Sequence, residues 1–257
     1  MGTPDIIEAA AQAWMASVGA IAEAVPGGQR TEREPGLALL ATGAPLAAVN
    51  GVFDVRAAPR AAGIGDLAKR AAEAVDAPWC IQYRTGPDAE IAGVAADHGL
   101  TSTARSPFMV RELGEHTPGG GPLPAGLTVR ALGAGDSAVF VSALAAGFEA
   151  PVETMSPLGC PEILALPCAT GYLAELDGDV VATGLALRAE DCVGVFNISV
   201  LPARRRQGLG AAVTGAILRA EQDRGARVAY LHASDMGLSL YESLGFRTVE
   251  QWTRHTR

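Results

Sequence analysis

The stretch that most constrains this chain is Val195–Ala220, which reads as a strand, a tight glycine turn and a helix. Apolar and β-branched residues open the stretch, and Pro202 ends the strand because proline has no N–H to give to a ladder. Leu209, Val213 and Ile217 then recur at helical spacing. The sequence therefore predicts a strand–turn–helix unit here.

The turn of this unit has the features of an anion site. The first N–H groups of a helix have no partner inside the helix, and the helix dipole leaves partial positive charge there. Gly208 and Gly210 have no Cβ, so a phosphate can approach the backbone closely. Arg205 and Arg206 can add charge-assisted hydrogen bonds. The alternative interpretation is a tight strand-to-helix turn with a solvated arginine run.

Two common phosphate loops are excluded by their residues. A Walker loop needs Gly-Lys followed by Ser or Thr, which the stretch lacks. A dinucleotide-binding turn needs a small residue three positions after Gly210, where Val213 stands. The spacing that is present is Arg205-x-x-Gly208-x-Gly210.

Composition narrows the class of protein. The chain has 257 residues, of which 49% are apolar and 19% charged, so it can bury a substantial core in one large or two small domains. The net charge of −8 argues against general nucleic-acid binding. No apolar run reaches the length of a membrane span, and the first residues lack a signal-peptide pattern, so we expect a cytoplasmic protein and no membrane partner.

The four cysteines give no reason to expect a metal. None of them forms a C-x-x-C pair or a metal-ligand spacing with histidine, so we interpret them as small hydrophobic residues in a reducing compartment. They are Cys80, Cys160, Cys168 and Cys192.

Glycine and proline density between positions 116 and 126 indicates a linker. We therefore predict domains at 1–115 and 127–257. In the first, helices are expected at 5–18, 64–75 and 88–98, and strands or extended segments at 37–42, 46–55, 78–84 and 101–113. In the second, strands are expected at 127–131, 171–176, 180–188, 192–200, 228–233 and 246–254, and helices at 136–146, 209–225 and 235–244, with 151–167 irregular or weakly helical. Asp177-Gly178 predicts a hairpin turn between the second and third of these strands, and Gly225 predicts the C-terminal end of the helix that follows the glycine turn.

A second motif, Tyr241-x-x-Leu244-Gly245-Phe246, follows about thirty residues after the glycine turn. Both motifs, in this order of strands and helices, resemble the GCN5-related N-acetyltransferase (GNAT) superfamily over 127–257. The resemblance implies a mixed α/β GNAT fold with acetyl-CoA as cosubstrate and no metal.

The resemblance also implies roles for individual residues. The strand ending at Val200 would splay from its neighbour, and pantetheine would pair with the backbone of Ile198, Ser199 and Val200. The Val200 N–H would polarise the acetyl carbonyl. Tyr241 would give a proton to the departing thiolate; its alternative role is packing or cofactor contact. The pyrophosphate would bind the side chain of Arg205, with Arg206 beside it, and the amides of Gln207, Gly208, Leu209, Gly210 and Ala211. Ser234 would contact the cofactor or cap a helix.

No general base stands out. Asn197 and Ser199 are neutral where some relatives carry a carboxylate. Glu153, Glu175 and Glu190 are candidates by charge, with a surface role as the alternative, and a water relay is a further possibility.

The first half contains Arg60-x-x-Gly63-x-Gly65, a fainter copy of the glycine motif followed by helix, strand and helix. We infer two GNAT-like domains in tandem. Asp66 is expected in the first turn of its helix, where it would repel a pyrophosphate, and no tyrosine matches Tyr241. The first copy is therefore predicted to be degenerate and to wall the acceptor pocket.

The expected activity is N-acetylation of a small-molecule or peptide amine by direct attack in a ternary complex. The alternative is a non-catalytic acyl-CoA sensor or assembly module. A homodimer is compatible with the sequence, which leaves the acceptor unidentified.

Overall fold

The computed structural model describes residues 3–114, 124–133 and 135–257, and they form two compact units. The first unit contains Met1–Met109, His232–Ser234 and Thr248–Arg257. The second contains Val110–Leu231 and Asp235–Arg247. The two units are described separately below.

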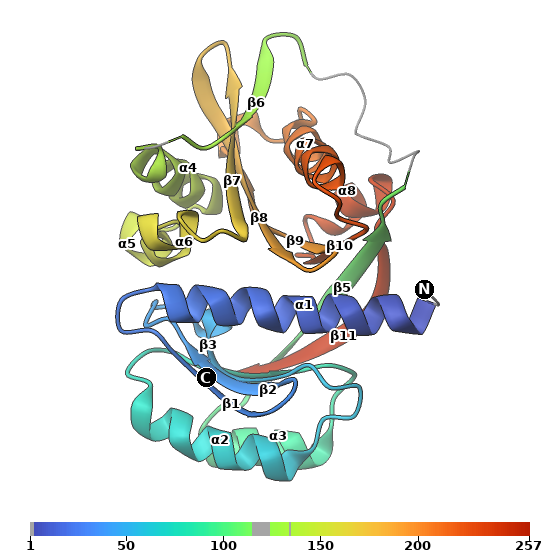
Figure 1. Cartoon of the computed structure of the whole chain (residues 1–257). Coiled ribbons are helices and arrows are strands. Elements are labelled where there is room, and N and C mark those ends of the chain that lie inside the picture. The colour runs from blue at the N-terminus through green and yellow to red at the C-terminus, as the bar shows by residue number, and fades with distance from the viewer. Residues whose placement is uncertain (1–2, 115–123, 134) are drawn as a thin grey trace. The chain divides into compact units, whose positions relative to one another are not determined.

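The first unit is built on a mixed sheet with the strand order β1-β2-β3-β4-β11-β5. The strands are β1 (Gln29–Glu34), β2 (Leu37–Ala41), β3 (Asn50–Asp54), β4 (Cys80–Tyr83), β5 (Ser102–Glu112) and β11 (Arg247–Thr256). β3 and β4 are parallel, whereas β1–β2, β2–β3 and β4–β11 are antiparallel. Helix α1 (Thr3–Ala24) covers one face, and α2 (Ala61–Ala74) and α3 (Ala89–Asp97) cover the other (Figure 1).

Helices on both faces explain why β2 is apolar and buried along its whole length. On the α1 side, the Trp14 ring lies 5.5 Å from Phe53 and 5.2 Å from Trp252, measured between ring centroids. On the other side, Ile64 and Leu67 of α2 belong to the buried core cluster with β2 and β3. Aromatic and aliphatic packing on both faces therefore stabilises the unit.

The second unit has the strand order β10-β9-β8-β7-β6. The strands are β6 (Leu127–Ala131), β7 (Ala169–Leu176), β8 (Asp179–Ala189), β9 (Cys192–Val200) and β10 (Val228–His232). β6 to β9 form an antiparallel meander, and β10 is parallel to β9. Helix α4 (Ser137–Phe148) with the short helices α5 (Val152–Met155) and α6 (Pro161–Leu164) lies on one face, and α7 (Leu209–Asp223) lies on the other (Figure 1). Helix α8 (Leu238–Ser243) follows β10.

Local turn chemistry is confirmed at two predicted positions. Asp177 and Gly178 both have positive φ, 54° and 91°, as a type I′ hairpin turn between β7 and β8 requires. Gly225 has φ 95° directly after α7, and the next amide, Ala226 N–H, donates back to Glu221 O at 2.9 Å. The sequence therefore specifies these two connections locally.

The structure differs from the predicted division in the C-terminal strand and in two short segments, because His232–Ser234 belong to the first unit and residues from Val110 belong to the second. It also adds a strand. β11 pairs with β4, so residues 248–257 belong to the first unit rather than to a domain at 127–257. β1, Gln-Arg-Thr-Glu-Arg-Glu, was not predicted, because an exposed edge strand carries no apolar alternation. Most of the predicted linker, positions 116–123, lies outside the described residues.

Candidate active site

The central feature of the second unit is a gap between two parallel strands. β9 pairs with β10 at Cys192–Val228, Val193–Ala229 and Gly194–Tyr230, and the ladder ends there among the described residues. β9 itself continues to Val200. Residues 195–200 of β9 therefore have backbone N–H and C=O groups on the β10 side that form no strand pairing. This confirms the predicted splay of the end of β9 from β10.

The peptide groups of Val200 face this gap. Leu201 N–H donates to Val181 O at 3.0 Å, which makes Leu201 and Val181 a hydrogen-bonded pair of the antiparallel ladder. The neighbouring pair, Val200 and Ala182, is therefore a non-hydrogen-bonded pair, whose N–H and C=O groups face away from β8. The Val200 N–H is thus directed to the side where the ladder with β10 has ended.

A β-bulge lies just before this point. Asn197 has φ 52°, and the β8–β9 register shifts between Thr183 and Leu185. Thr183 Oγ1 donates to Asn197 O at 2.9 Å, and Asn197 Nδ2 donates to Leu158 O at 3.0 Å. Asparagine tolerates this left-handed conformation better than most residues. The bulge therefore re-aims the end of β9 and is fixed on both sides.

The predicted glycine turn opens helix α7. Gly208 is the N-cap residue with φ 77°, Arg206 has φ 63°, and both are exposed. The first helical hydrogen bond runs from Ala212 N–H to Gly208 O at 2.9 Å, and no described side chain caps the helix at Gly208. A Cβ added at Gly208 would meet no atom within 4 Å. The N–H groups of Leu209, Gly210 and Ala211 therefore have no acceptor within the helix, and the space beside Gly208 is open, as an anion site at a helix N-terminus requires.

Gly210 lets helix α8 approach this turn. A Cβ at Gly210 would lie 2.9 Å from Leu240 Cδ1 and 3.7 Å from Val200 Cγ2. The glycine turn, the end of β9 and α8 are therefore packed together. Among the other predicted residues, Leu209 and Ser199 are buried, Ile198 and Ala211 are half-buried, and Gln207 is exposed.

Arg205 has partners other than the one predicted. Its Nη2 donates to Gly147 O at 2.8 Å and lies 2.8 Å from Glu149 Oε2, and its Nε lies 3.4 Å from Val200 O. Gly147 and Glu149 belong to the C-terminal end of α4. The structure therefore attaches this guanidinium to α4 and β9, whereas the sequence predicted a pyrophosphate ligand.

Tyr241 lies on α8, next to Leu240 in sequence, and its ring packs edge-on against Phe246 at 5.9 Å. Its hydroxyl makes no hydrogen bond to any residue that the structure describes. Burial raises the pKa of the Tyr241 phenol to about 12. The phenol therefore keeps its proton at neutral pH.

Three predicted base candidates have different surroundings. Glu175 lies near the level of Val200, but its carboxylate accepts a hydrogen bond from Arg130 Nε at 2.9 Å. Glu190 occupies the β8–β9 turn, roughly 30 Å along the strand from Val200. Glu153 of α5 is exposed and has no described side-chain partner. Ser234 is exposed and belongs to the first unit, so its predicted cofactor contact stays a prediction.

The first copy of the motif has a different structure. Helix α2 begins at Ala61 with Arg60 as its N-cap, so Gly63 and Gly65 lie inside the helix rather than in a turn before it. The prediction that Asp66 occupies the first turn is therefore wrong, because the helix begins earlier than expected. Asp66 instead forms an ion pair with Arg33 of β1.

The strand gap is also missing from the first copy. β3 and β4 pair in parallel from Gly51–Cys80 to Asp54–Tyr83, and Arg84 N–H continues the pattern by donating to Asp54 O at 3.1 Å. The backbone groups that β9 leaves free are therefore used in β3. This difference provides a physical reason for the predicted degeneracy.

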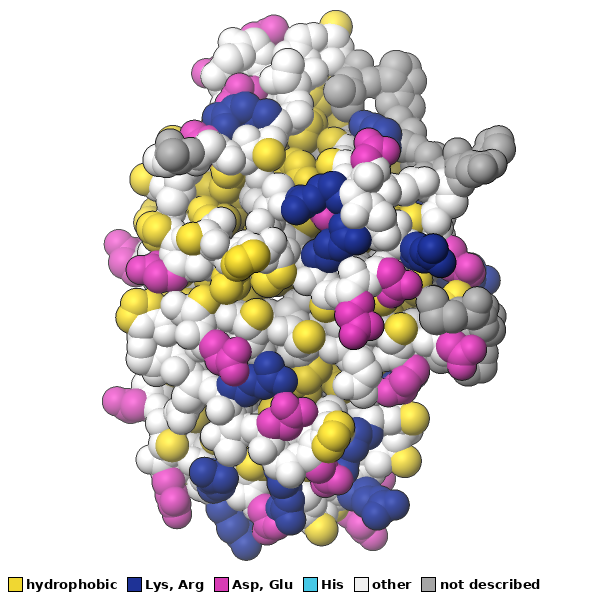
Figure 2. Space-filling model, viewed as in Figure 1, with side chains coloured by type: hydrophobic (Ala, Val, Ile, Leu, Met, Phe, Trp, Pro, Cys, Tyr) yellow, Lys and Arg dark blue, Asp and Glu magenta, His cyan; other side chains and the backbone are white. Residues whose placement is uncertain are grey.

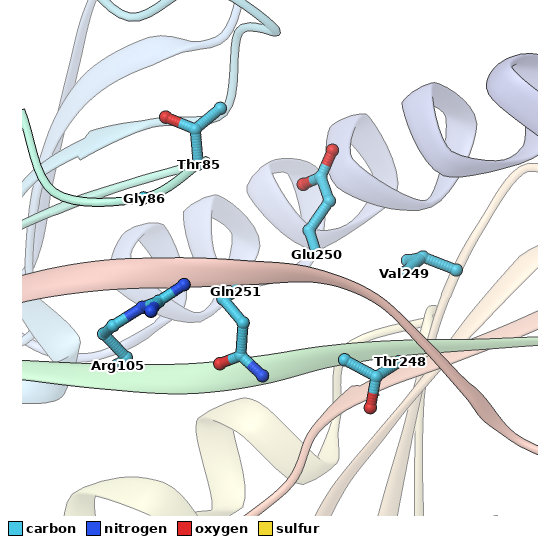
Figure 3. Close-up of a pocket in the computed structure, with 7 residues that line it drawn as sticks. All are labelled: Thr85, Gly86, Arg105, Thr248, Val249, Glu250 and Gln251. Carbon is cyan, nitrogen blue, oxygen red and sulfur yellow. The ribbon is translucent and has the colours of Figure 1, made fainter.

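A cavity of about 310 Å³ lies in the first unit and contains none of the predicted site residues (Figure 3). Glu250 points from β11 toward α1 in Figure 3, and its carboxylate accepts hydrogen bonds from Arg84 and Trp252. Thr85, also on the wall, has φ 76°. The other lining residues are Gly86, Arg105, Thr248, Val249 and Gln251.

The second unit has an apolar hollow of about 450 Å³ where α4 meets the start of β8 and the end of β9, lined by residues that include Val139, Val180 and Leu201. Hydrophobic side chains gather over α4–α6 in Figure 2. Val139, Phe148 and Val152 are the exposed large hydrophobic residues of these helices. No group of three potential metal ligands occurs among the described residues. In the described part of the chain no single helix has the length and apolarity to cross a membrane, although α4 with the bent segment Val152–Leu164 passes that test by length and composition.

Sequence reasoning missed Gly147 and Thr183. A Cβ at Gly147 would lie 2.5 Å from Ser199 Oγ and 3.2 Å from Val200 N, so this glycine allows α4 to touch the end of β9. Nothing local to Gly147 signals this contact. An asparagine within a mostly apolar strand, Asn197, was the available signal for the bulge.

Comparison with known proteins gives one family match and several structural matches. Residues 167–248 match the model of the acetyltransferase (GNAT) domain. A search of curated sequences found no match. The fold is similar to a GCN5-related N-acetyltransferase from Kribbella flavida, with a TM-score of 0.68 and 22% identity over 98% of this chain and 95% of that chain.

Two further structures have the same fold. A GCN5-related N-acetyltransferase from Sphaerobacter thermophilus matches with a TM-score of 0.58 and 18% identity over 80% of this chain and 71% of that chain. A functionally unknown conserved protein from Staphylococcus epidermidis matches with a TM-score of 0.64 and 11% identity over 89% and 93% of the two chains. At these identities the likeness is evidence for the fold.

Proposed function

We propose that this chain moves an acetyl group from acetyl-CoA to a primary amine, because residues 167–248 match the model of the acetyltransferase (GNAT) domain. The observation that carries the proposal is the splay of β9 from β10 directly before an open glycine turn. The gap offers a backbone edge for an extended amide-bearing chain, and the turn offers free amides for a pyrophosphate. Acetyl-CoA carries both groups.

The residues present fit the phosphate end of this cosubstrate. The space beside Gly208 is open, and the amides from Gly208 to Ala211 precede the first helical hydrogen bond. Exposed Arg206 adds a positive charge to the same turn. These features support an anion at the N-terminus of α7 held mainly by backbone donors.

The reaction requires a neutral amine, which attacks the thioester carbonyl as the C–N bond forms and the C–S bond breaks. The Val200 N–H, directed into the gap, would stabilise negative charge on the carbonyl oxygen. The amine nitrogen loses its extra proton to water or to a carboxylate, for which Glu153 is the candidate without a described partner. Tyr241 would return a proton to the thiolate, and its raised pKa keeps that proton available.

The test is release of CoA thiol from acetyl-CoA in the presence of a panel of amines, with a reaction lacking amine as the control for hydrolysis. Amine-dependent thiol release together with an acetylated product would support the proposal. CoA binding without transfer to any amine would instead favour an acyl-CoA sensor, the alternative that the missing base raises.

A further inference from the structure

We propose that Arg205 is a positioning residue that holds α4 against the end of β9, rather than a ligand of the cofactor pyrophosphate. The proposal rests on the proposed function, because the backbone that it positions is the Val200 amide of the acetyl site. It concerns a contact within the second unit only.

The first argument is the set of partners of the guanidinium. Nη2 reaches both Gly147 O at 2.8 Å and Glu149 Oε2 at 2.8 Å, and Nε reaches toward Val200 O at 3.4 Å. One planar group therefore touches α4 and β9 together. A guanidinium suits this task because its donors are fixed in a fork.

The second argument is the chemistry of the α4 terminus. The last carbonyls of a helix lack partners within the helix and carry partial negative charge. Glu149 has φ 54° and ends the helix in the left-handed conformation, with its N–H bonded to Ala146 O at 3.2 Å. Arg205 supplies a cation and a donor to this terminus. The Gly147 carbonyl and the Glu149 carboxylate thus bind the Arg205 guanidinium, which needs no phosphate as a partner.

The third argument is how closely α4 approaches the Val200 amide. A Cβ at Gly147 would meet Ser199 Oγ at 2.5 Å and Val200 N at 3.2 Å. The residue whose carbonyl Arg205 holds is thus the same residue that lies against the proposed oxyanion donor. Releasing Gly147 would let the Val200 N–H shift, which affects the chemical step more than cofactor binding.

Arg206 provides a contrast within the same turn. It is exposed, has φ 63°, and has no partner among the described residues. The turn therefore divides its arginines between two tasks: Arg205 braces the site from within, and Arg206 is left for the anion. A cofactor-binding role assigned from sequence spacing alone belongs to Arg206 better than to Arg205.

The experiment compares Arg205→Gln, Arg205→Lys and Arg206→Gln with Arg219→Gln, an exposed position on α7 with the same loss of charge. We expect Arg205→Gln to lower kcat at saturating acetyl-CoA at least tenfold while the Kd for CoA, measured by calorimetry, changes less than threefold. Arg205→Lys should recover part of kcat. Arg206→Gln should raise the Kd for CoA at least fivefold, and Arg219→Gln should change neither quantity by more than twofold.

Hydrogen exchange gives a readout that does not depend on activity. The amides of Glu149 and Ala150 bond to the last turn of α4 and should exchange at least fivefold faster in Arg205→Gln than in Arg219→Gln. A tenfold rise in the Kd for CoA with unchanged kcat and unchanged exchange would overturn the proposal. If wild-type protein binds no CoA, the proposed function fails, and the exchange rates alone still decide whether Arg205 holds α4.

Discussion

The bulge at Asn197 provides the sharpest link between local conformation and the proposed chemistry. Asn197→Val and Asn197→Gly both remove the hydrogen bond from Nδ2 to Leu158 O. Only the valine variant places a β-branched residue at φ 52°. Glycine adopts this conformation freely. The pair of variants therefore separates the loss of the side-chain contact from the loss of the bulge.

The magnitudes follow from these two effects. Losing the hydrogen bond costs about 1 kcal/mol. Glycine adds roughly 0.5–1 kcal/mol of chain entropy, which gives about 1.5–2 kcal/mol for Asn197→Gly. Left-handed backbone costs valine roughly 1–3 kcal/mol, which gives about 2–4 kcal/mol for Asn197→Val. The Asn197→Val protein can avoid part of this strain by losing the bulge. Losing the bulge changes the register of β9 by one residue, which turns the peptide groups after position 197, including the Val200 N–H, to the other side of the strand.

Urea denaturation measures the stabilities, and the amine-dependent thiol assay measures kcat. We expect Asn197→Gly to keep kcat within about threefold of wild type, because the Val200 N–H stays directed into the gap. Asn197→Val should lose at least tenfold in kcat in protein that is still folded. A valine variant with wild-type kcat would refute the role of the bulge in aiming Val200.

Three further predictions concern titratable or charged groups. Tyr241→Phe should lower kcat at least tenfold. Because the pKa of Tyr241 is raised to about 12, the wild-type rate should not fall between pH 8 and about 10. A fall in rate over that range would exclude the phenol as the general acid. Burial lowers the pKa of His232 to about 3, below its unfolded value of about 6.5. As the pH falls, the unfolded chain therefore takes up a proton at His232 before the folded chain does. The free energy of unfolding should drop by up to about 1.4 kcal/mol per pH unit below about pH 6. Urea titrations of wild type and His232→Gln check this slope, which should flatten in the variant. Arg84→Met should cost about 3 kcal/mol because it leaves the half-buried Glu250 carboxylate without its cation, with Trp252 Nε1 still donating to it. Arg84→Met with Glu250→Gln removes the uncompensated charge, keeps an acceptor for Trp252 and should recover part of that loss; equal costs for the single and double variants would contradict a coupled pair.

Local sequence patterns predicted those parts of the fold that depend on local physics. The Asp177-Gly178 hairpin, the stop at Gly225 and the open turn at Gly208 all depend on residues that adopt positive φ. The splay at Gly194 was also expected, because the family resemblance includes it. These features lie within a few residues of the signals that specify them.

Features that depend on distant partners were not predictable in the same way. β11 pairs with β4, and neither strand carries a signal of that choice in its own residues. Helix α2 begins at Ala61, so a matching glycine pattern at Gly63 and Gly65 has a different structure from the turn at Gly208. The pattern fixes the spacing of the glycines but not the residue at which the helix begins.

Arg205 shows the same limit for a side chain. Its place in the glycine motif predicted a phosphate ligand, but a long guanidinium reaches whichever acceptors the fold brings near it. Here those acceptors come from α4, at Gly147 and Glu149. The contact depends on the packing of α4 onto β9, which no short motif encodes.

The most direct measurement is a calorimetric titration of the full chain with CoA, alongside Gly208→Val and the matched first-copy variant Gly65→Val. A Cβ at Gly65 would lie 3.7 Å from Val94, an ordinary van der Waals distance, whereas Gly208 has φ 77° and faces the proposed anion site. The predicted result is one CoA bound per chain, at least tenfold weaker binding in Gly208→Val, and wild-type binding in Gly65→Val. Two molecules bound per chain, or binding that survives Gly208→Val, would contradict a single cofactor site at the open turn of α7.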